Sequence, residues 1–177
     1  GTVEDVLRRA AGEKYLEPWF SAEVIEPLHV KGMLERDISV LSGGELQRVA
    51  IAECLSRPVD IYLLDEPSAY LDVEERLAVA KAIRRITKMN GVTAFVVEHD
   101  IVAQDFISDK IMVFTGEAGS EGRGEDPLKL EDGMNQFLGE MGITFRRDAE
   151  TKRPRVNKDD SRLDREQKRD GRYYYVR

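Results

Sequence analysis

Two adjacent acids and one histidine are the side chains of this sequence best suited to phosphoryl-transfer chemistry. Asp65 and Glu66 follow one apolar run, and His99 follows a second. At the carboxyl end of a buried strand, the first acid can organise the water shell of a magnesium ion, and its neighbour can polarise an attacking water. If the two runs are neighbouring strands, His99 reaches the same edge, where it can contact a terminal phosphate. Isolated acids and histidines are more often solvated surface groups. A catalytic role for these three residues is therefore indicated only if the sequence also contains a phosphate-binding site.

A candidate phosphate site lies upstream of the acids, in the segment Leu41–Arg48. Ser42 and Glu45 stand in capping-box register at the start of an expected helix. Between them, Gly43 and Gly44 leave the backbone amides open to a ligand, and such a helix N-terminus binds anions. Taken alone, these residues more often make an ordinary capped helix, whereas the acid pair downstream favours a phosphate site.

The acids and the histidine are positioned by an alternation of strands and helices. Compact apolar runs at Val59–Asp65, Val92–Val97 and Lys110–Phe114 predict strands buried on both faces. Helical periodicity over Val73–Met89 and Ile101–Ser108 predicts the crossovers between them. This order predicts an α/β fold with a parallel sheet.

Helices are expected at both ends of this alternating region. Residues 2–11 predict a capped helix, the stretch 16–28 also has helical spacing, and Met134–Met141 predicts a short amphipathic helix. Residues 115–124 have the composition of a loop. We therefore expect three segments: a helical segment at residues 1–56, part of an α/β core at residues 57–115, and a linker with a short helix and a basic tail at residues 116–177.

The motifs resemble those of ATP-binding cassette (ABC) ATPases. Leu41–Gln47 is similar to their signature motif, and Ile61–Glu66 resembles their Walker B strand with its catalytic glutamate. Ser68–Asp72 resembles the D-loop, and His99 the switch histidine. The resemblance implies a partial ABC-type P-loop NTPase domain, with a parallel sheet core and a helical signature subdomain. It implies that residues 1–56 are the helical subdomain that ends in the signature helix, that residues 57–115 are the C-terminal half of the ATPase core, and that residues 116–177 include a basic hinge.

Longer phrases narrow the resemblance to the second nucleotide-binding domain and C-terminal hinge of the RNase L inhibitor family, ABC subfamily E, and to its archaeal members most of all. They are Tyr62–Asp72, Phe95–Asp100, Gly142–Asp148, Arg153–Lys158 and Leu163–Lys168. The family implies two tandem cassettes behind a domain with two [4Fe–4S] clusters. In that family, ATP binding closes the cassettes and, with a release-factor-like protein bound, splits the ribosome; hydrolysis reopens them and releases the small ribosomal subunit.

The resemblance also implies residue roles, with ATP and Mg²⁺ as cofactors. Glu66 would position or activate water, His99 would contact the γ-phosphate, and Asp65 would organise Mg²⁺ through water. Contacts to the ATP held by the first nucleotide-binding domain, and across the interface with it, would come from Ser42, Gly43, Gly44, Glu45, Gln47 and Asp72.

The sequence departs from the family pattern in what it lacks. No Gly-x-x-x-x-Gly-Lys-Ser/Thr phosphate loop occurs in it, and Cys54 is its single cysteine, too few for an iron–sulfur centre. We therefore expect the chain to be the C-terminal piece of a longer protein. We also expect the isolated chain neither to bind ATP tightly nor to hydrolyse it.

Charge is unevenly distributed along the chain. The total of −7 argues against binding nucleic acid by bulk charge, yet residues 145–177 hold 12 Lys plus Arg against 7 Asp plus Glu. The resulting +5 leaves −12 for residues 1–144. This basic arm could contact ribosomal RNA, pack against an acidic surface of the other cassette, or remain a solvated tail. Its basic and aromatic residues are Phe145, Arg146, Arg147, Arg153, Arg155, Lys158 and Tyr173–Tyr175, before a strand-like end at Val176.

The composition also bears on the compartment and on alternative functions. No apolar run is long enough for a membrane span, and the lone cysteine favours a reducing compartment, so we expect a cytoplasmic protein with no membrane partner. Two alternatives share the motifs: a cassette of another ABC ATPase, from a transporter or an SMC-type protein, and a non-catalytic docking module.

Overall fold

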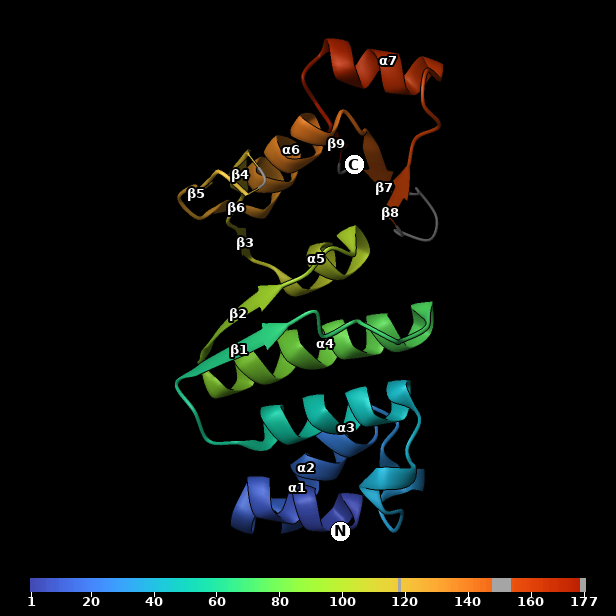
Figure 1. The fold of residues 1–177 in the computed structure, drawn as a ribbon, viewed down its shortest axis with the longest axis vertical. Helices are drawn as coiled ribbons and strands as arrows, with labels where there is room; N and C mark the ends of the chain where they lie inside the picture. The colour runs from blue at the N-terminus through green and yellow to red at the C-terminus, as the bar shows by residue number, and fades with distance from the viewer. Residues whose placement is uncertain (118, 148–153, 176–177) are drawn as a thin grey trace. The chain divides into compact units, whose positions relative to one another are not determined.

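The computed structural model describes residues 1–117, 119–147 and 154–175 and divides into two compact units, Gly1–Ile107 and Ser108–Arg177 (Figure 1). Residues on both sides of position 56, from Val3 to Ile86, share one hydrophobic core in the first unit.

Short helices build the beginning of the first unit. Helix α1 spans Val3–Ala11 and is capped as predicted, and the cap is a capping box between Thr2 and Asp5. The expected helical stretch 16–28 is instead interrupted, because Glu17 is extended and Pro18 starts a new turn. The successive short elements are η1 (Gly12–Leu16), α2 (Pro18–Phe20), η2 (Ser21–Ile25), η3 (Lys31–Met33) and η4 (Ile38–Val40).

The rest of the first unit alternates helices and strands as predicted. It contains α3 (Gly43–Ser56), β1 (Ile61–Asp65), α4 (Val73–Asn90), β2 (Thr93–Val97) and α5 (Ile101–Ile107). Strands β1 and β2 pair in parallel, from Ile61 opposite Thr93 to Asp65 opposite Val97. Helix α4 runs alongside β1 (Figure 1).

The two strands are not buried on both faces, which corrects the sequence prediction. Tyr62 and Leu64 point into the core, whereas the opposite face carries four exposed apolar side chains. Their exposed fractions are 53% for Ile61, 75% for Leu63, 52% for Phe95 and 61% for Val97. The reason is that the helices of the first unit pack against one face of the sheet, so side chains that alternate along each strand are alternately buried and exposed.

The prediction of a third parallel strand over Lys110–Phe114 is wrong, and so is the prediction of a loop over 115–124. The segment Lys110–Phe114 contributes to two short strands, and each of these pairs with an antiparallel partner. Strand β3 (Lys110–Ile111) pairs with β6 (Leu128–Lys129), and β4 (Phe114–Glu117) pairs with β5 (Glu121–Gly124). Gly116 in this hairpin has a φ of 138°, a backbone conformation that residues with a side chain rarely adopt.

The remainder of the second unit is a small sheet between two helices. Helix α6 spans Leu130–Met141 and includes the predicted helix. Strands β7 (Phe145–Arg147), β8 (Pro154–Val156) and β9 (Tyr174–Tyr175) form a sheet in the order β8-β7-β9, and α7 spans Arg162–Arg169.

Buried polar side chains join α7 to this sheet. The Thr144 hydroxyl donates to Asp164 Oδ1 at 2.5 Å and accepts from the Asn157 amide at 2.9 Å. The Gln167 amide donates to the Phe145 carbonyl at 3.1 Å. The hydroxyl of Thr144, followed by Lys168, lowers the pKa of Asp164, so this carboxyl is held ionised. The described part of the basic arm is therefore folded rather than a solvated tail, while Arg153 and Val176 lie outside the described residues.

Candidate functional site

The start of α3 is shaped by a capping box, as the sequence predicts. The Glu45 amide donates to Ser42 Oγ at 3.3 Å, and the Ser42 amide donates to Glu45 Oε2 at 2.8 Å. The other carboxylate oxygen of Glu45 accepts from the Arg36 guanidinium at 2.5 Å. Arg36, followed by the Ser42 amide, lowers the pKa of Glu45 to about 2. Both oxygens of Glu45 thus hold the helix start in place.

The two glycines of this segment have different surroundings. A Cβ atom added to Gly44 would lie 2.9 Å from the carbonyl oxygen of Tyr70, whereas one added to Gly43 would lie 3.9 Å from the Tyr70 ring. Gly44 therefore allows the loop between β1 and α4 to approach α3 closely, a packing role that the sequence analysis did not identify.

Gln47 connects α3 to the same loop. Its side-chain amide lies 3.4 Å from the carbonyl oxygen of Glu66 and 3.3 Å from that of Pro67, and it donates hydrogen bonds to both. The candidate phosphate site at the start of α3 and the acids after β1 are consequently neighbours in space, although nineteen positions separate Gln47 from Glu66.

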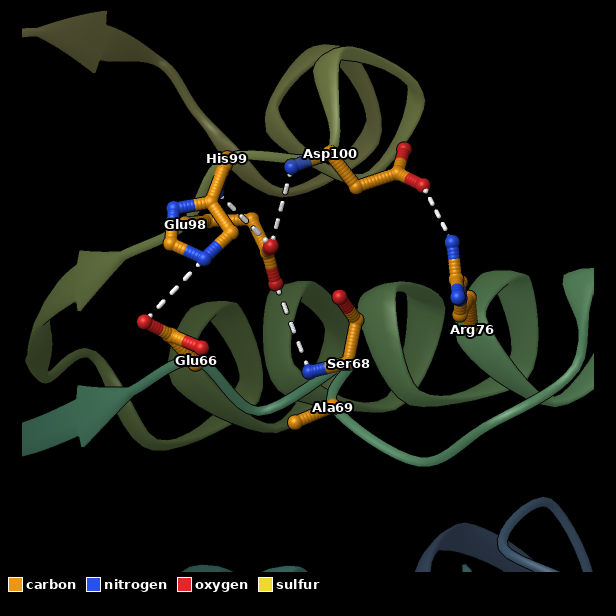
Figure 2. A pocket seen from close by; sticks show the side chains of 7 residues that line it. All are labelled: Glu66, Ser68, Ala69, Arg76, Glu98, His99 and Asp100. Atoms are coloured by element: carbon orange, nitrogen blue, oxygen red, sulfur yellow. Dashed lines mark hydrogen bonds and ion pairs between the residues drawn. The ribbon is translucent and has the colours of Figure 1, made fainter.

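The carboxyl ends of β1 and β2 bring the predicted acids and histidine together. Asp65 is the last residue of β1, opposite Val97. The Glu66 amide donates to the Val97 carbonyl at 2.9 Å, and Glu66 has a φ of 46°, in the left-handed region that is costly for residues with a side chain. His99 Nε2 lies 3.0 Å from Glu66 Oε1 (Figure 2). Both side chains are exposed, so this carboxylate–imidazole pair is accessible to a ligand.

The pair lies at a hollow of about 310 Å³ whose wall includes residues that the sequence analysis did not select. Glu98, Arg76 and Asp100 line it together with Glu66 and His99 (Figure 2). Arg76 and Asp100 form an ion pair of 2.9 Å. Glu98 and Asp100 could have been identified from the sequence, because they flank His99. Arg76 lies in α4, and nothing in the sequence indicates that it is near His99.

The loop from Glu66 to Asp72 ends at the start of α4. The Asp72 carboxylate accepts from the Glu75 amide at 2.9 Å and so caps this helix. Tyr70 within the loop has a φ of 63° and a side chain that is 82% exposed. Both ends of the loop are therefore anchored, while its middle presents an aromatic ring to solvent.

The acids at the strand end fit a magnesium site in which one carboxylate acts together with a bound nucleotide. In the part of the chain that the structure describes, no three His, Cys, Asp or Glu residues are grouped so as to hold a metal ion. Asp65 is an exposed carboxylate at the strand end beside Glu66. A single carboxylate is what Mg²⁺ needs when nucleotide phosphates and water complete its shell.

Within the described residues, no helix is long and apolar enough to cross a membrane.

Comparison with known proteins agrees with this arrangement. The ABC transporter family matches the chain over residues 7–69. The chain is 56% identical to an uncharacterized ABC transporter ATP-binding protein of Methanocaldococcus jannaschii and 44% identical to translation initiation factor RLI1 of Saccharomyces cerevisiae. Each comparison extends over 176 residues and covers 99% of this chain but 29% of the relative.

A solved structure gives the same result for the fold. The archaeal ribosome recycling factor aABCE1, crystallised with the archaeal ribosomal stalk protein aP1, matches 99% of this chain and 34% of its own chain, with a TM-score of 0.93 and 53% identity. The fold is thus that of an α/β ABC ATPase domain, of which this chain forms a part. Close homologues of the chain are members of the RLI1 family, also called RNase L inhibitors.

Proposed function

We propose that this chain is the second nucleotide-binding domain and C-terminal hinge of a twin-cassette ABC ATPase that splits and recycles ribosomes. The contact of 3.0 Å between Glu66 and His99, beside the glycine-rich start of α3, is the observation that carries the proposal. Similarity over 99% of the chain to an archaeal ribosome recycling factor supports it.

The proposed chemistry is hydrolysis of ATP by an activated water. Glu66 holds its carboxylate 3.0 Å from His99 Nε2, and an exposed acid so placed would orient a water and take up its proton. The His99 side chain is 72% exposed beside Glu66, where it would contact a terminal phosphate. Asp65 would hold Mg²⁺ through water, and the metal, when bound, neutralises charge that develops on the phosphates.

The start of α3 is proposed to serve the nucleotide of the other cassette. Ser42, Gly43 and Gly44 place a capped helix N-terminus toward that γ-phosphate, and backbone amides at such a terminus favour negative charge. Glu45 and Gln47 hold this terminus and connect it to the loop after β1, and Asp72 ends that loop. A cassette interface built in this way would couple the two nucleotide sites.

We infer that the isolated chain does not hydrolyse ATP. Its sequence contains no phosphate loop, and the exposed face of β1 and β2 with Ile61, Leu63, Phe95 and Val97 is an apolar surface of the kind that the remaining half of an ATPase core would cover. The lysine and glycine-rich cradle for the β- and γ-phosphates would come from that half.

The proposed partners are the first nucleotide-binding domain of the same protein, the small ribosomal subunit and a release-factor-like protein, in the cytoplasm. Iron–sulfur clusters would belong to a part of the protein outside this chain. The exposed Arg146, Arg155 and Lys158 of the basic arm are proposed to contact ribosomal RNA or an acidic surface of the other cassette, because positive side chains favour a negatively charged partner.

ATP hydrolysis by the full-length protein tests the proposal. Glu66→Gln should abolish turnover, because the amide cannot take a proton from water, while ATP should still bind. Asp60→Asn is the matched control, because Asp60 is an exposed acid at the opposite end of β1 and should leave turnover unchanged. Turnover by the 177-residue chain alone, lost in Glu66→Gln, would show that the phosphate loop is dispensable and would refute the inferred inactivity.

A further inference from the structure

Glu98 makes an unusual set of contacts for an acid at a strand end. Its Oε1 accepts hydrogen bonds from the backbone amides of His99 at 2.9 Å and Asp100 at 3.0 Å, and its Oε2 accepts from the Ser68 amide at 3.3 Å. One carboxylate therefore connects the loop after β1 to the loop after β2 (Figure 2).

The loop after β1 needs such support. Glu66 and Tyr70 both have positive φ values, 46° and 63°, and backbone of this kind persists only where surrounding contacts hold it. Arg76 provides a second attachment, because its guanidinium donates to the Leu71 carbonyl at 2.9 Å and pairs with Asp100 at 2.9 Å. The loop is thus attached to the second loop near its beginning and near its end.

Glu98 is also poorly suited to act as a base itself. An ionised carboxylate has about four lone-pair positions, and three backbone amides already occupy positions on Glu98. Glu66 has the exposed carboxylate that faces His99. Glu66 and Glu98 therefore have different surroundings: the carboxylate of Glu66 is open to a ligand, and that of Glu98 binds backbone amides.

We propose that Glu98 is a positioning residue that fixes the loop Glu66–Asp72 to the loop Glu98–Asp100, so that Glu66 and His99 keep the distance that hydrolysis needs. This proposal rests on the proposed function. A displacement of His99 by a bound phosphate is transmitted through Glu98 to Ser68, in the loop that leads toward Tyr70 and Asp72. The site for one nucleotide and the loop facing the other cassette then move together.

Two variants of the full-length protein separate the contacts. Glu98→Ala removes all three hydrogen bonds, whereas Glu98→Gln keeps the size of the side chain but leaves one acceptor oxygen, enough for one loop. Misplacing a catalytic group by about 1 Å costs about 100-fold in rate, so we expect kcat to fall about 100-fold in the alanine variant and less in the glutamine variant. The KM for ATP should change little, because phosphate contacts do not involve Glu98.

A double variant shows whether Glu98 acts through the histidine. If it does, Glu98→Ala should reduce kcat little further in a His99→Ala background, whereas independent losses would multiply. Asp60→Ala, which removes an acid at the other end of the same sheet, is the control and should match the wild type. Losses that multiply, or a wild-type kcat in Glu98→Ala, would overturn the proposal.

Amide hydrogen exchange tests the contact without using activity. The peptide that contains Ser68 should exchange faster in Glu98→Ala than in the wild type and in Asp60→Ala. Unchanged exchange there would overturn the positioning role even if the protein hydrolyses ATP. A wild-type protein without ATPase activity, but with accelerated exchange in Glu98→Ala, would instead refute the proposed function and leave the connection between the loops established.

Discussion

Replacing Gly44 with alanine should destabilise the chain, whereas the same replacement at Gly43 should not. The added methyl group at Gly44 would lie 2.9 Å from the Tyr70 carbonyl oxygen and 3.8 Å from Leu71 Cδ2, while at Gly43 it would lie 3.9 Å from the Tyr70 ring. A backbone oxygen cannot rotate away as a side chain can, so the loop with the strained Tyr70 must shift.

The magnitude follows from the difference between the two variants. Both alanines gain helix propensity, about 0.5–1 kcal/mol relative to glycine within a helix, so this gain nearly cancels in the comparison. Overpacking costs about 1–3 kcal/mol, so Gly44→Ala should be less stable than Gly43→Ala by that amount. For a chain of this size the difference corresponds to roughly 2–4 °C in Tm per kcal/mol.

Urea denaturation followed by far-ultraviolet circular dichroism measures the two unfolding free energies under the same conditions. Gly43→Ala serves as the matched control, because it changes the same helix turn by the same methyl group. Equal stabilities would refute the reasoning, because they would show that α3 and the loop after β1 are not in the close contact described above.

Two further predictions concern single side chains. The carboxyl of Glu45 should titrate near pH 2, so its contribution to the start of α3 is complete above its ordinary pKa of 4.5 and is lost as the pH falls through about 2. Arg36→Ala should move this titration toward 4.5 in carboxyl-carbon NMR, and an unmoved midpoint would show that Arg36 is not the cause. Thr144→Val should destabilise the second unit by about 1–3 kcal/mol, because Asp164 and Asn157 each lose a hydrogen bond to the Thr144 hydroxyl in a buried network. Thermal unfolding measures this loss, and an unchanged Tm would count against the network.

Local signals predicted α1, α3, α4, α5, α6 and the two parallel strands, but neither the interruption of the stretch 16–28 nor helix α7. The predicted capping pair Ser42–Glu45 forms, and the predicted helix at residues 2–11 is capped, because a capping box depends only on residues three positions apart. The strand predicted at Lys110–Phe114 failed because short apolar runs do not reveal their partners, and here glycine allows a hairpin instead.

Burial of the sheet was harder to predict for a different reason. A continuous apolar run indicates that both faces of a strand suit an apolar environment, but it says nothing about which part of a protein supplies the cover. Leu63 and Phe95 have the side chains of a buried strand and are exposed in this chain.

The sequence predicted individual residues of the candidate site but not the hydrogen bonds that connect the loops around it. Asp65, Glu66 and His99 could be placed at one sheet edge from the order of strands alone. The contacts of Gln47 with Glu66 and of Glu98 with Ser68 join residues nineteen and thirty positions apart, and they depend on how α3 and the two loops pack. Sequence spacing holds no information of that kind.

Ribosome splitting by the full-length protein tests the central claim most directly. With ATP and a release-factor-like protein, the wild type should convert ribosomes to subunits over many rounds, as followed in sucrose gradients. Glu66→Gln should close and split once, then remain with the small subunit because it cannot reopen by hydrolysis. Repeated splitting by Glu66→Gln at the wild-type rate, or no ATP-dependent splitting by the wild type, would contradict the account.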